Sequence, residues 1–128
     1  MHATGAVLVV DGANVVGSRP TGWWRDRAGA ARTFVDQLRA AAAAGRIDER
    51  LVVVLEGQAR QGVPAGEEAG VTVVHADGSG DDMLVEVAAS AAGRHVTMVT
   101  SDRELRRRAQ AVGAAVVGPG WLLALLDD

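Results

Sequence analysis

Residues 6–14 read AVLVVDGAN, a short apolar run that ends abruptly at Asp11. The run is rich in β-branched residues and apolar at every position, which is typical of a parallel strand covered on both faces. Four later segments have the same character, and they are residues 51–55, 71–74, 96–99 and 115–117. Only residues 57–70 form a long irregular connection. The sequence therefore predicts a parallel sheet of five strands.

Helical patterns lie between most of these runs. They are predicted at residues 28–44, 81–92, 102–112 and 119–126. Gly45 is a natural stop for the first helix, Ser79 is placed to cap the second, Gly113 ends the third and Pro119 begins the last. The order β-α-β-β-α-β-α-β-α defines one α/β domain over residues 1–128, with right-handed crossovers.

The composition excludes several classes of function. All thirteen basic residues are Arg, and the formal net charge is −3. Without Lys the chain cannot support Schiff-base chemistry or a Walker-type nucleotide site. Without Cys it forms neither disulfides nor thiolate metal sites. The net negative charge differs from the strong basic excess of a typical electrostatic nucleic-acid binder. No segment is predicted to be a signal peptide or a membrane span, so we expect a cytoplasmic protein.

Acidic residues follow the predicted strands. Asp11, Glu56 and Asp102 come after the first, second and fourth strands, and Asp81 and Asp82 open the helix reached from the third. Ligands of an open parallel sheet bind beyond the carboxyl ends of its strands, so these carboxylates are expected to gather at one rim. Each acid alone is also a typical turn or helix-capping residue, but that role does not explain acids at several strand ends.

The predicted helix at residues 81–92 places further acids where a metal could bind them. Asp81 shares the apolar stripe of the helix, Asp82 lies at the border of the stripe, and Glu86 is one turn further on. Carboxylates that cluster without Lys repel one another, and a divalent cation relieves the repulsion. Because their hard oxygens suit Mg²⁺ or Mn²⁺, we predict such a metal site at the rim, with Glu56 and Glu86 as possible further ligands.

Three motifs resemble those of NYN domains, the nuclease relatives of the PIN fold. They are VVDGANVVGS at residues 9–18, GDDMLVE at 80–86 and VTSDRELRRRAQAVGA at 99–114. The resemblance spans nearly the whole chain, and the subgroup that the chain looks closest to is the bacterial YacP-like NYN proteins. It implies a Rossmann-like three-layer fold, with parallel strands three, two, one, four and five side by side and helices on both faces. It also implies Mg²⁺- or Mn²⁺-dependent hydrolysis of RNA phosphodiester bonds.

The resemblance implies roles for individual residues as well. The metal-binding acids would be Asp11, Asp81, Asp82 and Asp102. Asn14 would position the metal-bound water or the phosphate, and Ser101 and Thr100 would donate to a carboxylate or to the scissile phosphate. Many relatives have an Asp at the end of the second strand, whereas this chain has Glu56, which still supplies a carboxylate.

RNA binding would need positive charge beside the acidic rim. Arg19 and Arg25 follow the first motif, and Arg103 and Arg107 belong to the last. Arg103 adjoins Asp102 and is the best candidate for a bidentate contact with phosphate. The expected partner is single-stranded RNA, with the ribosome or a companion protein supplying specificity.

The sequence also fits one alternative to a ribonuclease, and it argues against two other classes of protein. The main alternative is a non-catalytic RNA- or protein-binding module of the same fold. Trp23 and Trp24 fit either stacking on an unpaired base or packing against the sheet or a second copy. A phosphoacceptor receiver domain relies on a Lys that this chain lacks. A phosphatase of the haloacid dehalogenase type needs Asp-x-Asp after the first strand, where this chain has DGAN.

Overall fold

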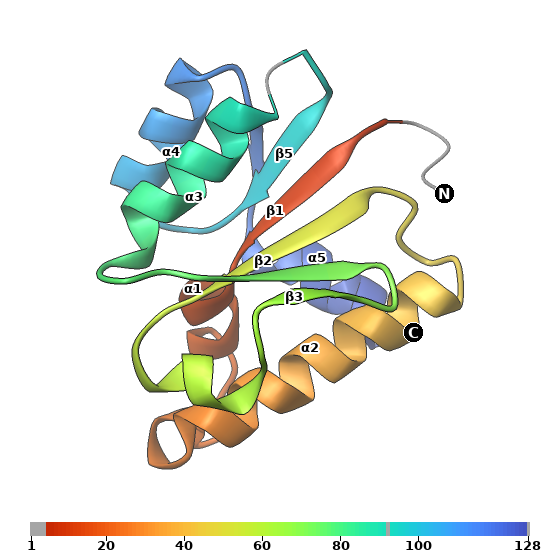
Figure 1. Ribbon diagram of the computed structural model, residues 1–128, viewed down its shortest axis with the longest axis vertical. Helices are drawn as coiled ribbons and strands as arrows, with labels where there is room; N and C mark the ends of the chain where they lie inside the picture. The colour runs from red at the N-terminus through yellow and green to blue at the C-terminus, as the bar shows by residue number, and fades with distance from the viewer. Residues whose placement is uncertain (1–4, 92, 128) are drawn as a thin grey trace.

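A computed structural model of the chain describes residues 5–91 and 93–127. One mixed sheet lies between two layers of helices (Figure 1). The strands are β1 (Val7–Asp11), β2 (Arg50–Leu55), β3 (Gly66–Glu68), β4 (Val71–His75), β5 (Val96–Val99) and β6 (Ala115–Val117). The helices are α1 (Gly12–Gly17), α2 (Arg27–Ala43), α3 (Gly80–Ser90), α4 (Arg103–Ala111) and α5 (Pro119–Leu126), with 3₁₀ turns η1 (Trp23–Arg25) and η2 (Gly57–Gly62).

The sheet contains the five predicted strands and one more. Its order is β3-β4-β2-β1-β5-β6, and every neighbouring pair is parallel except β3 with β4. The prediction of a purely parallel, five-stranded sheet was therefore wrong, because β3 extends the edge in the antiparallel direction. β3 has no apolar pattern to reveal it. Its residues, Gly-Glu-Glu, are all exposed and join the sheet through their backbone.

The helices differ from the prediction mainly by one short element. α1 was not predicted, because six residues reading GANVVG are too few to show a helical period. The other helix ends shift by one or two residues, as the fraying of helix termini leads one to expect. Ser79 caps α3, as predicted, by accepting a hydrogen bond from the backbone N–H of Asp81 (3.2 Å). The predicted end of that helix, Ala92, lies outside the described residues.

Both faces of the sheet are covered, which explains why the strands are apolar at every position. Leu8 and Val10 of β1 point to the face covered by α1, α2 and α5. Val7 and Val9 point to the opposite face, which is covered by α3 and α4. All four side chains are buried. Burial on two sides stabilises the central strands by about 25 cal/mol for each Å² of apolar surface removed from water.

The parallel register brings the carboxyl ends of three strands to one level. Val10 is paired with Val99 of β5, and Asp11 is paired with Val54 of β2. Thr100 therefore follows β5 on one side of Asp11, and the end of β2 lies on the other side. These strand ends lie on the side of the molecule where α1 and α3 begin (Figure 1).

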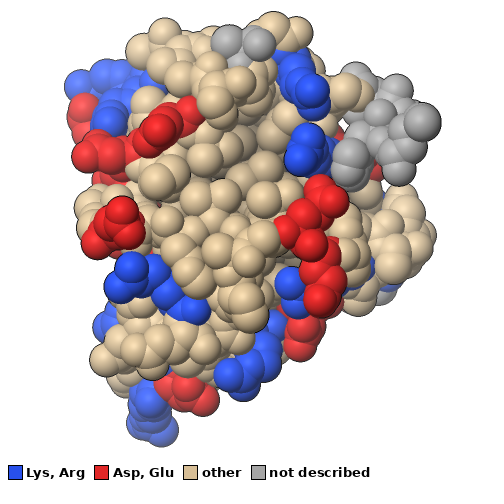
Figure 2. Space-filling model, in the orientation of Figure 1, with Lys and Arg blue, Asp and Glu red and all other residues tan. Residues whose placement is uncertain are grey.

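The surface has no single dominant charge on the face seen in Figure 2, where acidic and basic side chains alternate around a largely uncharged middle. Several acids are matched by Arg. Arg39 lies 3.4 Å from Glu68, and Arg50 lies 3.7 Å from Glu67. Within the described ranges, no helix has both the length and the apolar character needed to cross a membrane.

Gly12 supplies a test of how tightly α1 docks on the sheet. A Cβ at this position would lie 2.7 Å from the backbone oxygen of Val54 and 2.9 Å from the side chain of Leu55. Gly12→Ala is therefore expected to lower the free energy of unfolding by about 1–3 kcal/mol, the usual effect of overpacking. Urea unfolding followed by circular dichroism measures this change.

Gly120→Ala is the matched control, because Gly120 also lies in the first turn of a helix but has open space around it. Ala favours the helix there by up to about 1 kcal/mol. Equal unfolding midpoints for the two variants would contradict the close approach of α1 to β2.

Candidate active site

Asp11 is the buried centre of the acidic rim. It is the last residue of β1 and the N-cap of α1, and the residue is only 7% exposed. One carboxylate oxygen, Oδ1, accepts a hydrogen bond from the backbone N–H of Asn14 (3.2 Å). The other, Oδ2, accepts from the hydroxyl of Thr100 (2.9 Å), a fully buried side chain that follows β5. Neutral donors thus orient this carboxylate without cancelling its charge.

A short chain of hydrogen bonds joins the first motif to the last. The Thr100 hydroxyl, which donates to Asp11, also accepts from the backbone N–H of Asp102 (3.2 Å). Asn14 Oδ1 accepts from both the backbone N–H (2.9 Å) and the hydroxyl (3.0 Å) of Ser101. Asp102 caps α4 by accepting from the backbone N–H of Leu105 (2.9 Å). The predicted neighbourhood of these residues is therefore present.

Glu56 and Asp81 form the other side of the rim. The Glu56 carboxylate accepts from the backbone N–H of Gly80 (3.1 Å), the first residue of α3. A Cβ at Gly80 would lie 3.2 Å from the second Glu56 oxygen, so the helix start and this carboxylate are closely packed. Asp81, the next residue, is half-buried. A carboxylate at a helix N-terminus is favoured by the helix dipole.

Mutual repulsion shows that these acids lie close together. Burial raises the pKa of the Asp11 carboxyl, and the nearby charges of Asp81 and Glu56 raise it further. The hydrogen bonds from Thr100 and Asn14 act in the opposite direction. The pKa of Asp81 is raised by partial burial and then by Asp102 and Glu56. These interactions link four acids from four segments, which are Asp11, Glu56, Asp81 and Asp102, and Asp81 takes part in an interaction with each of the other three.

Two predicted site acids lie outside the centre of this group. Asp82 is exposed and forms an ion pair with Arg108 of α4 (2.8 Å). Its charge still raises the pKa of Asp81, although Arg108 lowers it more. Glu86 is exposed on α3 and, among the described residues, has no hydrogen bond or ion pair that ties its side chain to the rim.

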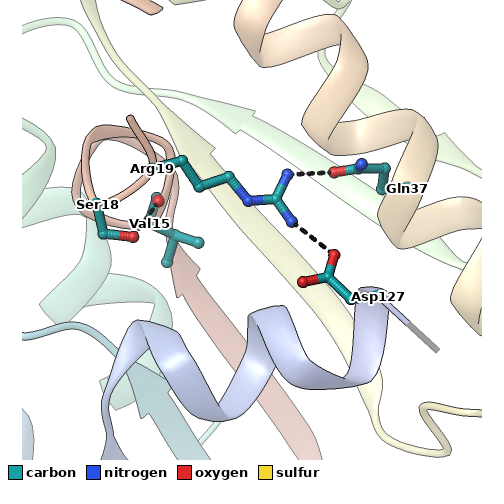
Figure 3. A network of polar contacts seen from close by, with 5 residues as sticks. All are labelled: Val15, Ser18, Arg19, Gln37 and Asp127. Carbon is teal, nitrogen blue, oxygen red and sulfur yellow. Dashed lines mark hydrogen bonds and ion pairs between the residues drawn. The ribbon is translucent and has the colours of Figure 1, made fainter. Parts of the chain in front are cut away.

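The four Arg residues predicted to bind RNA have different surroundings. Arg19 donates to Gln37 (2.8 Å) and reaches Asp127 (3.4 Å), so it ties α1 to α2 and to the end of α5 (Figure 3). Arg107 pairs with Glu104 (3.2 Å). Arg103 is exposed, and its guanidinium has no hydrogen-bond or ion-pair partner in residues 5–91 and 93–127.

Arg25, the fourth, lies over the exposed ring of Trp24, with its guanidinium carbon 5.7 Å from the ring centroid. Arg25 and Arg103 are therefore available on the surface. Arg19 instead has a structural role in holding three helices together.

The rim fits a divalent cation by its chemistry, although its acids are not gathered into a coordination shell. Among the described residues, no group of three or more His, Asp or Glu side chains is arranged so that it could hold a metal ion. The available donors are carboxylate oxygens, which Mg²⁺ and Mn²⁺ prefer. Burial raises the pKa of Asp11 and Asp81 most, and the repulsion among the neighbouring acids, which raises it further, is the part that such an ion would relieve.

Sequence reasoning missed two contacts that shape the rim. No partner was predicted for Arg108, which forms an ion pair with Asp82. Glu56 was treated as a doubtful ligand, and its role in holding the start of α3 was not foreseen. Neither contact joins residues close in the chain, so no local pattern signals them.

Together, the sheet and the rim define an α/β domain of three layers with acidic residues at the carboxyl ends of its central strands. The chain is similar to two crystal structures of Rae1 (YacP) from Bacillus subtilis and has a YacP-like fold. A point-mutant structure gives a TM-score of 0.70 at 18% identity, over 95% of this chain and 75% of that one. The other gives 0.65 at 19% identity, over 94% and 73%. No protein-family model matches the sequence, and no curated protein matches it.

The buried charge of Asp11 predicts a variant that is more stable than the native chain. Because its pKa is raised in the folded state, folding favours the protonated carboxyl, and ionisation lowers stability as the pH rises through that pKa. Asp11→Asn keeps the shape and removes the charge. In the absence of metal we expect its Tm at pH 7 to rise by a few degrees, the shift produced by about 1 kcal/mol in a domain of this size.

The difference in Tm between Asp11→Asn and the native chain should become smaller at acidic pH, where the native carboxyl is itself protonated. Thermal unfolding at a series of pH values measures both effects. Asp48→Asn removes an exposed acid and serves as the control, and its Tm at pH 7 should not rise comparably. A lower Tm for Asp11→Asn at pH 7 would show that the ionised carboxylate stabilises the fold, contrary to this account.

Proposed function

We propose that the chain is a ribonuclease that hydrolyses phosphodiester bonds of single-stranded RNA, with Mg²⁺ or Mn²⁺ as its cofactor. The observation that carries the proposal is the connected rim, in which buried Asp11 is joined through Thr100 to Asp102 while Glu56 and Asp81 lie near enough to raise its pKa. The NYN-like motifs and the YacP-like fold support it.

The acids of the rim would hold the cation. Asp11, Asp81 and Asp102 are the proposed ligands, with Asp82 and Glu56 as further carboxylates beside them. When bound, the cation lowers the pKa of a coordinated water and offsets negative charge that develops on the phosphate. Its affinity should fall on acidification, because protonation of Asp11 and Asp81 occurs at higher pH than for ordinary carboxyls.

The neighbouring polar groups would orient both carboxylate and substrate. Thr100 holds one oxygen of Asp11 and the backbone of Asp102 at once. Asn14 uses its side-chain oxygen for Ser101, which leaves the amide N–H groups of Asn14 to donate to a water or a phosphate oxygen. The exposed guanidinium of Arg103 would contact the RNA backbone bidentately.

The second candidate is a non-catalytic module that binds RNA or protein. The lack of a ready coordination shell among the described residues favours it. In both candidates the net charge of −3 leaves little long-range attraction for RNA. We therefore propose that the ribosome or a companion protein brings the RNA to the rim.

Asp102→Asn tests the catalytic proposal while preserving the fold. Asn caps helices as well as Asp does, so the bond to the Leu105 N–H and the start of α4 should survive. Loss of a carboxylate ligand is expected to slow cleavage of a labelled single-stranded RNA about 100-fold or more in the presence of Mn²⁺ or Mg²⁺, the scale of losing one strong electrostatic contact. EDTA should abolish cleavage by the native chain.

Asp26→Asn is the matched control. Asp26 caps α2 through the N–H of Gly29 (2.9 Å) and lies outside the acidic rim, so its variant should cleave at the native rate. Mn²⁺ should also raise the Tm of the native chain and raise it less for Asp102→Asn. Undiminished cleavage by Asp102→Asn or in EDTA would contradict the proposal, and RNA binding without cleavage would favour the non-catalytic module.

A further inference from the structure

A pocket of about 320 Å³ opens directly beside the acidic rim. Its walls come from the start of α1, from η1, from the first turns of α2 and from the end of β2 with η2. Gly12, which follows Asp11, and Glu56 both line it. A molecule in this pocket would therefore touch two of the segments that form the rim.

The pocket walls are mainly apolar, with a few polar groups. Ala13, Val16, Leu55 and Ala59 contribute aliphatic surface, and the half-buried indole of Trp23 forms part of another wall. This mixture is typical of sites for small organic groups, and the volume lies at the small end of their range. One flat ring of moderate size fits better than a run of several.

Arg27 adds a positive charge to the same pocket. Its guanidinium carbon lies 5.0 Å from the centroid of the Trp23 ring. The side chain of Arg27 is exposed and has no carboxylate partner in the described part of the chain. A purely apolar occupant would leave this charge unmatched. An occupant with a planar ring and an anionic group would use the apolar wall and the cation together.

We propose that this pocket binds one unpaired nucleotide of the RNA strand, with the base against Trp23 and a phosphate near Arg27. The inference rests on the proposed ribonuclease function, because it makes the pocket the site that holds the nucleotide next to the cleaved bond. Bases stack on aromatic side chains whatever their sequence. Arg binds phosphate oxygens in a planar, bidentate manner.

Trp24 is the natural comparison for Trp23. The two rings meet edge to face with their centroids 6.0 Å apart. Trp24 is 53% exposed and does not line the pocket. A general affinity of exposed aromatic rings for bases would depend on Trp24 at least as much as on Trp23, whereas binding in the pocket depends on Trp23.

The test uses nucleotide binding to the full chain without metal, so that no cleavage is needed. Nucleoside 5′-monophosphates and ribose 5-phosphate are titrated separately, and the Trp23 indole N–H and the Ala13 and Ala59 methyl groups are followed by NMR. The nucleotides should shift these signals and ribose 5-phosphate should not. Trp23→Leu should weaken binding about tenfold, the effect of losing one stacked base, while Trp24→Leu should change it less than twofold.

A second variant guards against loss of folding in Trp23→Leu. Ala13 is an exposed residue of α1 that lines the pocket, so Ala13→Leu places a larger side chain in it. Leu has a high helix propensity, so α1 should be kept. This variant should also weaken nucleotide binding about tenfold. Ala40→Leu, on an exposed position of α2 outside the pocket, should leave it unchanged.

The outcomes separate this inference from the proposed function. The inference would be overturned if ribose 5-phosphate shifted the NMR signals as much as the nucleotides do. It would also be overturned if Trp23→Leu and Trp24→Leu lost the same nucleotide affinity. Either result would count against the pocket even if the native chain cleaves RNA. The inference would be supported if nucleotide binding is weakened by both Trp23→Leu and Ala13→Leu. This holds even if no cleavage is found and the ribonuclease proposal fails.

Discussion

The buried carboxylate of Asp11 is the constraint on which the arrangement of the site depends. A charge removed from water is costly unless polar groups surround it, and here the partners come from two separate segments. Asn14 supplies a backbone N–H from α1, and Thr100 supplies a hydroxyl from the segment after β5. The bond from Asn14 is a local cap of α1, whereas the Thr100 hydroxyl reaches Asp11 only when β1 and β5 pair in the observed register. The stability of the sheet and the geometry of the rim are therefore coupled.

The kind of partner matters as much as its position. Among the described residues Asp11 has no ion-pair partner, and Arg108, whose positive charge lowers the pKa of Asp81, is paired with Asp82. The rim thus keeps an excess of negative charge within a folded domain, which is a destabilising arrangement in the absence of a ligand. Sites of this kind are typical of functional positions, where stability is lower than the fold could otherwise achieve. A bound cation is the simplest way to relieve the repulsion.

Hydrophobic patterns in the sequence predicted most of the fold, because both faces of the central strands are buried and each strand is an unbroken apolar run. They also placed the acids, since a residue after a parallel strand must lie at the carboxyl edge. β3 escaped prediction because its exposed Gly-Glu-Glu segment joins the sheet only at an edge. The ion pair of Asp82 with Arg108 and the bonds of Arg19 escaped because they join segments distant in the chain. Such contacts depend on how helices pack, which no local pattern encodes.

The proposed binding of RNA is compatible with a net negative charge, because the placement of the Arg residues matters more than their number. Arg19, Arg39, Arg50 and Arg108 are engaged by acids of the chain itself. Arg103 and Arg27 have no such partner among the described residues, and each lies next to a segment of the rim, one after Asp102 and one in the pocket lined by Glu56. Two positive charges without an acidic partner are therefore left beside segments that carry the acids of the rim. In the proposed function they would hold phosphates of the strand near the carboxylates, and a bound cation would offset the repulsion between phosphate and carboxylate.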